Sequence, residues 1–364
     1  MAKKEASKDK DLTKAQRKRK AEILRKEVQQ VRVGKGMKAA DLVDAMAGMS
    51  VQARNVGRCA RVLDGMMRDK GRPTVLLGLA GPLIAAGLRN VIADLIGGGY
   101  VDVLVSTGAI LYQDVYQSRG HRHFVGTPTA DDVELRSLYI DRIYDTYVDE
   151  EKFIRTDEWC GRIADTMGPG AFSSRQYLAH LSAHIEDPSS ILHQCRKKGV
   201  PVFCPAINDS SIGIGLTDHR HRCVLAGREG IRIDSIQDNY EIAQLVGKSK
   251  KTAAIYVAGG VPKNYINDAV VMGYFLGMEG GHSYALQVTT ANPADGGLSG
   301  STLGEAQSWG KIEAEAKFAM AWVEPSVALP LLAAYLFDRH PNPKRGRLVY
   351  DWDGQVLKSL KVAR

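Results

Sequence analysis

The segment from Asp295 to Lys311, DGGLSGSTLGEAQSWGK, brings a glutamate, a tryptophan and a lysine together beside a glycine-rich turn. A lysine forms an imine only when its amine is neutral, and burial against apolar walls favours that neutral form. Trp309 could provide such a wall, or could hold a cationic substrate by cation–π attraction. Glu305 could move protons or pair with an ammonium. The spacing is compatible with imine chemistry at Lys311, and also with a solvated turn on the surface.

Further segments carry a resemblance to a known family. In chain order the segments are QARNVGR (Gln52–Arg58), VDVLVST (Val101–Thr107), PVFCPAINDSSIG (Pro201–Gly213), GGVPK (Gly259–Lys263), EAQSWGK (Glu305–Lys311) and ALPLL (Ala328–Leu332). Each resembles a segment of the deoxyhypusine synthase family, in the family's order, between about residue 50 and about residue 340. The resemblance implies a homotetramer whose NAD and amine sites lie at a dimer interface.

The resemblance also implies a reaction, the NAD-dependent transfer of a 4-aminobutyl group. A hydride leaves the carbon beside a secondary amine of a polyamine donor, and the aminobutyl unit passes to Lys311 as a Schiff base. An acceptor amine then displaces Lys311, and the borrowed hydride returns to the new imine, so that NAD is not consumed. Glu305 and Trp309 complete the catalytic residues that the resemblance assigns.

No dinucleotide fingerprint of the form GxGxxG follows a strand, so the NAD site rests on the resemblance. The positions that match the family's NAD segments are Thr107, Asp209, Ser211, Thr290, Ala291, Asp295, Ser299 and Glu324. Asp209 and Glu324 are the candidates for the ribose hydroxyls, because a carboxylate accepts two hydrogen bonds from a diol. For Asp209, a helix N-cap is the structural alternative.

The amine site is where the chain departs from the family. Two of the family's acids fall on Ile214 and Leu298, its histidine falls on Asn264, and a further carboxylate falls on Gln113. Losing two buried carboxylates removes attraction of roughly a few kcal/mol for a dication. We therefore expect a small amine such as putrescine as acceptor, as in homospermidine synthases. The alternatives are a deoxyhypusine synthase acting on a lysine of the hypusine-carrying translation factor, and a non-catalytic subunit that activates a paralogue.

Composition limits the other classes of function. The five cysteines are scattered and form no CxxC pair, which is typical of reduced thiols in a cytoplasm. The longest uncharged apolar run, residues 73–88, contains three glycines and two prolines and is too short to span a membrane. Three histidine patterns were weighed as metal sites: His180 with His184, His121 with His123, and His219 with His221. The last two would each share one face of a strand, but their interleaved arginines repel a cation, so we expect no metal.

The positive charge is concentrated at one end of the chain. Residues 1–39 hold 14 Lys and Arg against 5 Asp and Glu, a net charge of +9, which leaves −1 for the rest of the chain's +8. Nucleic acid is therefore an unlikely partner except through this arm. Residues 14–33 have helix-forming residues with a thin apolar stripe, which suits a cap on a neighbouring subunit, a hold on an acidic partner or a frayed tail.

Strand-like and helix-like segments alternate after the arm. The expected strands are Thr74–Leu79, Val101–Ser106, Val200–Cys204, Ala253–Val257 and Tyr284–Thr290, and the expected helices include Asp41–Asp69, Leu83–Ile96, Ser174–His184 and Ser189–Lys198. The alternation predicts an α/β fold with a three-layer, Rossmann-like parallel sheet and helices on both faces. We expect an arm over 1–39, one NAD-binding domain over 40–340, and a C-terminal extension over 341–364 that forms a hairpin around Asp353 and Gly354.

Overall fold

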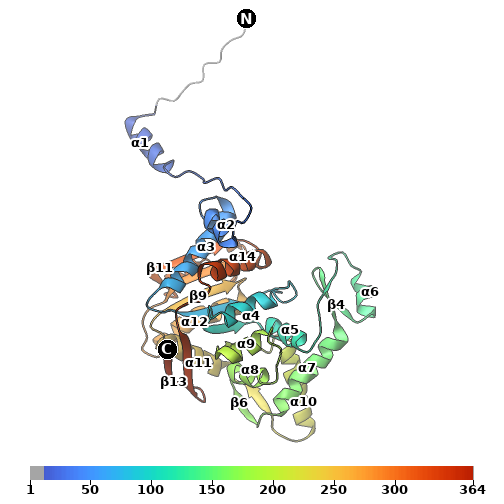
Figure 1. The fold of residues 1–364 in the computed structure, drawn as a ribbon. Helices are drawn as coiled ribbons and strands as arrows, with labels where there is room; N and C mark the ends of the chain where they lie inside the picture. Colours follow the sequence, from blue (N-terminus) through green and yellow to red (C-terminus); the bar gives the residue numbers. More distant parts are fainter. Residues whose placement is uncertain (1–11, 364) are drawn as a thin grey trace.

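The computed structural model describes residues 12–363 (Figure 1). Its centre is a six-stranded sheet in the order β11-β10-β9-β1-β2-β7, in which every neighbouring pair is parallel. The strands are β1 (Thr74–Leu79), β2 (Val103–Ser106), β7 (Val202–Phe203), β9 (Thr252–Val257), β10 (His282–Val288) and β11 (Ile312–Ala321). The predicted α/β fold with a parallel sheet is confirmed.

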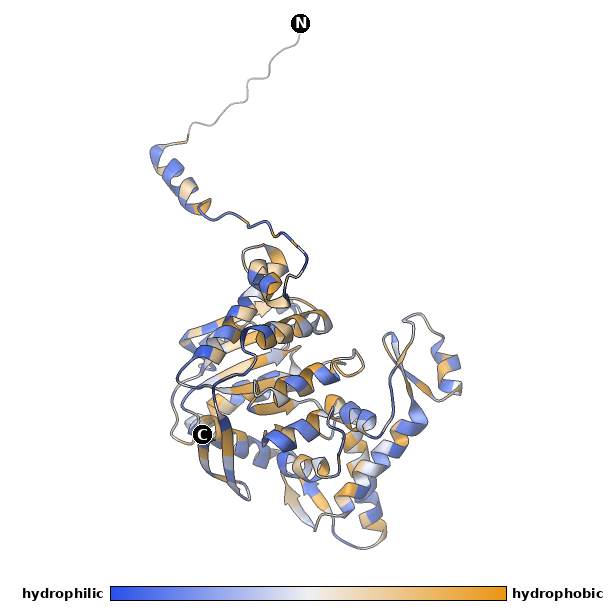
Figure 2. Ribbon diagram, in the orientation of Figure 1, coloured by the Kyte–Doolittle hydropathy of each residue, from blue (hydrophilic) through white to orange (hydrophobic). Residues whose placement is uncertain are grey.

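Helices cover both faces of this sheet, because alternate strand residues point to opposite sides. Val75, Leu77 and Leu79 of β1 belong to one hydrophobic core, whereas Leu76 belongs to the other. Figure 2 shows hydrophobic residues gathered on the central strands and on the inward sides of the helices. The helices are α1 (Lys14–Ile23), α2 (Ala39–Met46), α3 (Val51–Arg68), α4 (Arg89–Gly97), α5 (Gly108–Ser118), α6 (Asp132–Ser137), α7 (Glu150–Asp165), α8 (Ser174–Ser182), α9 (Ile191–Lys198), α10 (Ser211–Leu225), α11 (Ser235–Lys248), α12 (Gly260–Tyr274), α13 (Leu303–Ser308) and α14 (Pro325–Arg339).

Three small sheets lie outside the central one. They are β3 (Phe124–Val125), β5 (Thr146–Asp149) and β4 (Ile140–Ile143); β6 (Gly170–Phe172) and β8 (Ile231–Ile233); and β12 (Arg347–Asp353) with β13 (Val356–Ala363). The last pair is the antiparallel hairpin predicted around Asp353 and Gly354. It docks on the body: the Tyr350 hydroxyl donates to the Asp102 carbonyl at 2.7 Å, and Leu357 is fully buried.

Two of the expected helices differ from the structure. The segment 41–69 is two helices, because the chain turns between α2 and α3 and Val51 takes a positive φ of 54°. The segment 83–96 is helical only from Arg89, because a turn closed by Gly87 at φ 84° precedes it. Each expected strand overlaps an observed one, with ends that differ by up to two residues.

Within its described part, residues 12–38, the basic arm contains one short helix and extends away from the body (Figure 1). Thr13 and Gln16 form a capping box at the start of α1, and no residue of this helix is buried. Ile23 and Leu24, from the predicted apolar stripe, are about two-thirds exposed at 67% and 65%. Residues 1–11 of the arm lie outside the described residues. Across residues 12–363, no helix has the length and apolar character to cross a membrane.

Candidate active site

Lys311 is held by its backbone at the amino end of β11. Its N–H donates to the carbonyl of Ala306 in α13 at 3.0 Å, and its carbonyl accepts from the N–H of His282 at 3.0 Å. The short helix α13 and strand β10 therefore fix the position from which the side chain projects. His282 is the first residue of β10 and is fully buried.

The Lys311 side chain points to a carboxylate that the sequence analysis did not single out. Its Nζ lies 2.8 Å from Oδ1 of Asp268 on α12 and 5.6 Å from the centre of the Trp309 ring. Asn264, one turn earlier on α12, donates to the other Asp268 oxygen at 2.8 Å. The Lys311 side chain is 17% exposed, so it is enclosed by polar as well as aromatic groups.

Trp309 is not the buried wall that the sequence suggested. Its side chain is 71% exposed, and its ring faces the Lys311 Nζ, 5.6 Å from the ring centre. Asp268 could have been found from its spacing, because residues four apart on a helix share a face and Asn264 was already a candidate. The pairing with Lys311, which is 43 positions along the chain from Asp268, has no signal in the sequence.

Glu305 forms a capping box with Thr302 at the start of α13. The Glu305 carboxylate accepts from the Thr302 N–H at 2.5 Å, and the Thr302 hydroxyl accepts from the Glu305 N–H at 3.1 Å. The backbone hydrogen bond from Thr302 lowers the pKa of Glu305. An exposed carboxylate with a lowered pKa is suited to pairing with a cation and poorly suited to donating a proton near neutral pH.

A buried lysine fixes the loop that leads to this site. Lys263 on α12 is 1% exposed and donates to the carbonyls of Leu298 and Ser301 at 3.2 and 2.5 Å. Burial lowers the pKa of Lys263 to about 8. Ser299, in the same loop, accepts from the Gly260 N–H at 2.9 Å. A side chain at Gly259 would meet Ser299 at 2.7 Å, so this close approach needs glycine.

Most of the candidate NAD residues follow the carboxyl ends of the parallel strands. Thr107 follows β2, Asp209 lies in the loop after β7, Thr290 follows β10, and Glu324 follows β11. Helices α5 and α12 begin at this edge with no hydrogen bond from a capping side chain. The first backbone N–H groups of α5 suit a pyrophosphate, whereas in α12 the Gly260 N–H already donates to Ser299 and Pro262 has no N–H. This edge is where such sheets bind ligands.

Several NAD candidates lie at helix starts or in turns. The N-cap of α10 is Ser210, so the alternative of Asp209 as a cap is wrong. Glu324 is itself the N-cap of α14 and accepts from the Ser326 N–H at 2.8 Å, which occupies one of its oxygens. Ser211 begins α10, Ala291 lies one residue beyond Thr290, and Asp295 ends a short 3-10 turn, η1 (Pro293–Asp295).

Most of the candidates fall into two groups within the chain, and Thr290, Ala291, Asp295 and Glu324 belong to neither. The α5–α10 group consists of Thr107, Gln113, Asp209, Ser211 and Ile214. The α12–α13 group consists of Asn264, Asp268, Leu298, Ser299, Glu305, Trp309 and Lys311. Within residues 12–363, no hydrogen bond or ion pair joins members of the two groups.

Gln113, in the first group, accepts from the Ala85 N–H at 3.2 Å and is buried. Ile214 is 58% exposed. Ile214, which stands where the family has an acid, therefore adds an apolar patch to the surface of this chain and leaves no buried cavity.

Among residues 12–363, one cluster has the residue types of a metal site, Asp165 with His219 and Cys223. His219 lies in helix α10, so the expected strand around His219 and His221 is wrong. Its Nδ1 lies 2.7 Å from Asp165, and its Nε2 accepts from the Ile231 N–H at 3.1 Å. Because both ring nitrogens are engaged, the cluster ties α7, α10 and β8 together and offers no open ligand.

Comparison with known proteins agrees with the resemblance in the sequence. The family model described as deoxyhypusine synthase matches residues 41–336. A "Deoxyhypusine synthase-like protein" of Chlorobaculum tepidum is 42% identical over 328 residues, covering 88% of this chain and 89% of the relative. A "Probable deoxyhypusine synthase 2" of Methanosarcina mazei is 40% identical over 338 residues, covering 90% of this chain and 94% of the relative.

A solved structure shows the same fold. It is that of a candidate deoxyhypusine synthase of Entamoeba histolytica, which superposes with a TM-score of 0.58 at 17% identity and covers 85% of this chain and 97% of the other. At that identity the likeness concerns the fold. From the family model and the two sequence relatives, the chain belongs to the deoxyhypusine synthase family.

Proposed function

We propose that this protein is an NAD-dependent transferase that passes an aminobutyl group from a polyamine, through an imine on Lys311, to a small acceptor amine. The observation that carries the proposal is the contact of Lys311 Nζ with Asp268 at 2.8 Å, beside the Trp309 ring. Surface lysines pair with acids often. Here the lysine stands in the SWGK segment, its partner Asp268 stands on α12, and α13 and β10 fix the lysine's backbone, which supports a catalytic role.

Asp268 supports two steps of this reaction. Lys311 must lose a proton before its amine can attack the donor imine, and a carboxylate at 2.8 Å is within reach of that proton. The protonated Schiff base formed on Lys311 again carries a positive charge at Nζ. Asp268 stabilises that charge too, and the Trp309 ring face adds cation–π attraction.

The residues at the carboxyl edge of the sheet suit NAD. The uncapped start of α5 would hold the pyrophosphate, and Asp209 and Asp295 are exposed carboxylates available to hydroxyl groups. When bound, NAD would supply reversible hydride transfer at the carbon beside the donor's amine. Because free imines hydrolyse, the site must also exclude water, and Trp309, which is exposed in one chain, would need covering for that purpose.

The choice of a small acceptor rests on Ile214 and Leu298, which are apolar where the family has acids. Two missing carboxylates weaken the hold on a long dication.

The second candidate is a deoxyhypusine synthase that modifies a protein lysine, which the names of the relatives favour. The third is an activating subunit without catalysis, which the intact Lys311 site disfavours. We further propose a cytoplasmic homotetramer, as the family resemblance implies.

Borohydride trapping tests the covalent step. Purified protein is incubated with NAD and spermidine, reduced, digested and analysed by mass spectrometry. We expect an added aminobutyl mass on the peptide that contains Lys311, and none on Lys311→Arg, because a guanidinium does not form the imine. An adduct on another lysine, such as Lys263, would place the chemistry elsewhere.

Product analysis tests the acceptor. The same incubation without borohydride is carried out with putrescine, and separately with a hypusine-type translation factor as acceptor. Homospermidine without accumulation of NADH is the expected result. Deoxyhypusine formed faster than homospermidine would favour the second candidate, and stoichiometric NADH would indicate a simple amine dehydrogenase.

A further inference from the structure

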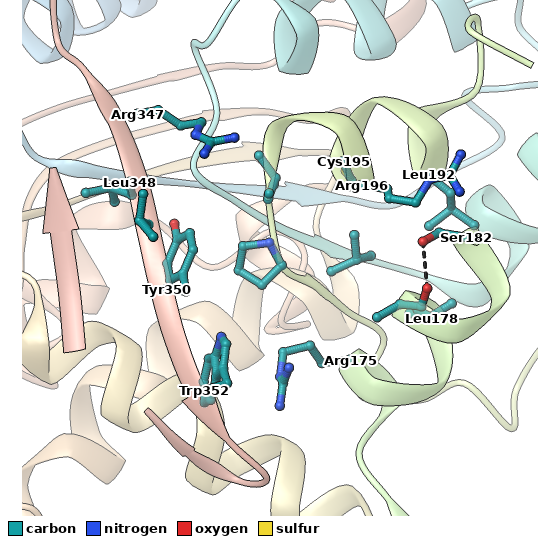
Figure 3. Close-up of a pocket in the computed structure, with 16 residues that line it drawn as sticks. Arg175, Leu178, Ser182, Leu192, Cys195, Arg196, Arg347, Leu348, Tyr350 and Trp352 are labelled. Carbon is teal, nitrogen blue, oxygen red and sulfur yellow. Dashed lines mark hydrogen bonds between the residues drawn. The ribbon is translucent and has the colours of Figure 1, made fainter. Parts of the chain in front are cut away.

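A cavity of ≈ 340 Å³ lies between the C-terminal hairpin and the body, outside the edge strand β7. Figure 3 shows β12 on one side of it, with Arg347, Leu348, Tyr350 and Trp352, and helices α8 and α9 on the other. Leu178, Leu192, Cys195, Val200, Val202 and Leu348 are among its apolar lining residues. The volume is in the range of small-molecule sites. None of the residues assigned to the candidate active site lines it.

The walls of this cavity are fixed at both ends of the hairpin. At one end, Arg72 donates to the Gly346 carbonyl at 2.6 Å. At the other, Arg175 donates to the Gly354 carbonyl at 3.0 Å and stacks on the Trp352 ring at 4.0 Å. A cavity whose walls are already held in place loses little conformational entropy when it binds a ligand.

The charge around the cavity is positive. Its 16 lining residues include Arg175, Arg196 and Arg347 and no Asp or Glu. Arg175 is neutralised by Glu241, to which it donates at 2.7 and 3.1 Å. Arg196 donates to two backbone carbonyls and lies 3.7 Å from the exposed carboxylate of Glu186. Within residues 12–363, Arg347 has no carboxylate partner.

A second hollow of ≈ 240 Å³ continues past Arg347 on the other side of the strand. It shares Gly199, Val200, Arg347, Leu348 and Tyr350 with the first and adds Lys198, which has no carboxylate partner within the described part of the chain.

The only acid in the second hollow is Asp102. Its carboxylate is already saturated by Arg72, Arg345 and the Val75 N–H, each at 2.8 Å. The junction of the two hollows is therefore cationic.

We propose that this cavity binds a small amphipathic anion, a carboxylate or sulfonate on an apolar body. The apolar body would pack on Leu178, Leu192 and Val200, and the anionic group would lie at Arg347, where the hollows meet. The lining presents a guanidinium but no acid to pair with it, so an anionic ligand would supply the missing partner. A polyamine is excluded as the ligand because the lining repels cations. This site is independent of the reaction proposed for Lys311.

Anilinonaphthalene sulfonate, a fluorescent apolar sulfonate, is a suitable probe. Its fluorescence is titrated against the full-length protein, and bound probe is then displaced with octanoate, octanol or octylamine. We expect octanoate to displace the probe and octanol and octylamine to do so poorly. Arg347→Gln should weaken probe binding by about tenfold, which corresponds to about 1.4 kcal/mol. Ala179→Phe, which fills the apolar part from the surface of α8, should weaken it as well.

Arg155→Gln is the matched control, because it removes one exposed positive charge from α7 and lines neither hollow. It should bind the probe as the unaltered protein does. No binding by the unaltered protein, or equal binding by all three variants, would overturn the proposal. Displacement by octanol as strong as by octanoate would show an apolar pocket without the anion site.

Discussion

Asp268 and Lys311 pair as ions, although imine formation consumes a neutral amine. The pair is useful because the reaction passes through two cationic states at one atom, the ammonium and the protonated Schiff base. A carboxylate that faces this atom from α12 stabilises both, and it also holds the lysine chain in one rotamer. At the residue scale, Asp268 restores to the site an acid of the kind missing at Ile214 and Leu298.

Asp268→Asn tests this role. The substitution keeps the size of the side chain but removes its charge and replaces one of its two acceptor oxygens by a donor, so the rate of adduct formation on Lys311 should fall about ten- to hundredfold. The measurement is single-turnover borohydride trapping as a function of pH, with thermal melting and NAD affinity followed in parallel.

Asp268→Glu should recover part of the rate, and Asp353→Asn, which breaks an exposed ion pair with Lys358, should leave it unchanged. If the unaltered protein forms the adduct and Asp268→Asn forms it equally fast, that result would contradict the role given to Asp268 but not the proposed function.

The sequence predicted the contact of Lys311 with Trp309, because their spacing in SWGK is local. It did not predict the partner of Lys311, because Asp268 reaches the site through the packing of α12 against the loop of Leu298 to Ser301. Nor did it predict that Glu305 is occupied as a helix cap, although TLGE at 302–305 is a capping-box pattern.

At the scale of elements, a buried carboxyl joins α8, α11 and the end of β7. Oδ1 of Asp238 accepts from the N–H and the hydroxyl of Ser174, each at 2.9 Å, and the same hydroxyl accepts from the Cys204 N–H at 2.8 Å. Burial raises the pKa of Asp238 to about 7, and the nearby Glu241 carboxylate acts in the same direction. This junction therefore prefers a protonated acid.

The stability of the protein should depend on pH through Asp238. The raised pKa means that the folded state keeps a proton that the unfolded state releases near pH 4, so this contribution is complete below about pH 4 and is lost as pH rises towards 7. A tenfold change in proton affinity corresponds to about 1.4 kcal/mol, so the loss is on the order of a few kcal/mol.

Urea unfolding at several pH values measures this dependence, and comparison with Asp238→Asn isolates it from other groups. The variant should show a flatter decline between about pH 4 and pH 7. A decline as steep as in the unaltered protein would mean that Asp238 is ionised in the folded state.

The buried strands were predicted well because uninterrupted apolar runs bounded by Gly and Pro are typical of parallel sheets. The helix breaks were not, because they depend on the backbone. Val51 at φ 54° reverses the chain between two helices whose apolar periodicity continues through the break. Such a backbone conformation leaves no mark in the hydrophobic pattern.

At the scale of the whole molecule, most of the candidate residues divide between two places in the chain. The α5–α10 group contains Asp209, and the α12–α13 group contains Lys311. Apolar side chains around the second group are open in one chain: Trp309 is 71% exposed, Val261 46% and Leu298 41%. The proposed reaction needs a dry site, so a second copy that brings its α5–α10 group over these side chains would meet both requirements.

Mixing two inactive variants tests this arrangement. If Lys311 and Asp209 act in the same site from different subunits, a mixed dimer of Lys311→Ala with Asp209→Ala has one site carrying both changes and one intact site. The purified mixed dimer should then have about half of the unaltered activity, because one of its two sites is intact. The two variants are co-expressed with different tags, the mixed species is purified, and homospermidine formation is measured.

Lys311→Ala mixed with Asp268→Ala is the matched control, because both residues belong to one group and no intact site can form. If both mixtures recover the same activity, or if neither recovers activity although each mixed species assembles, the arrangement is wrong. Asp209 and Lys311 would then lie within one subunit's site or in no common site.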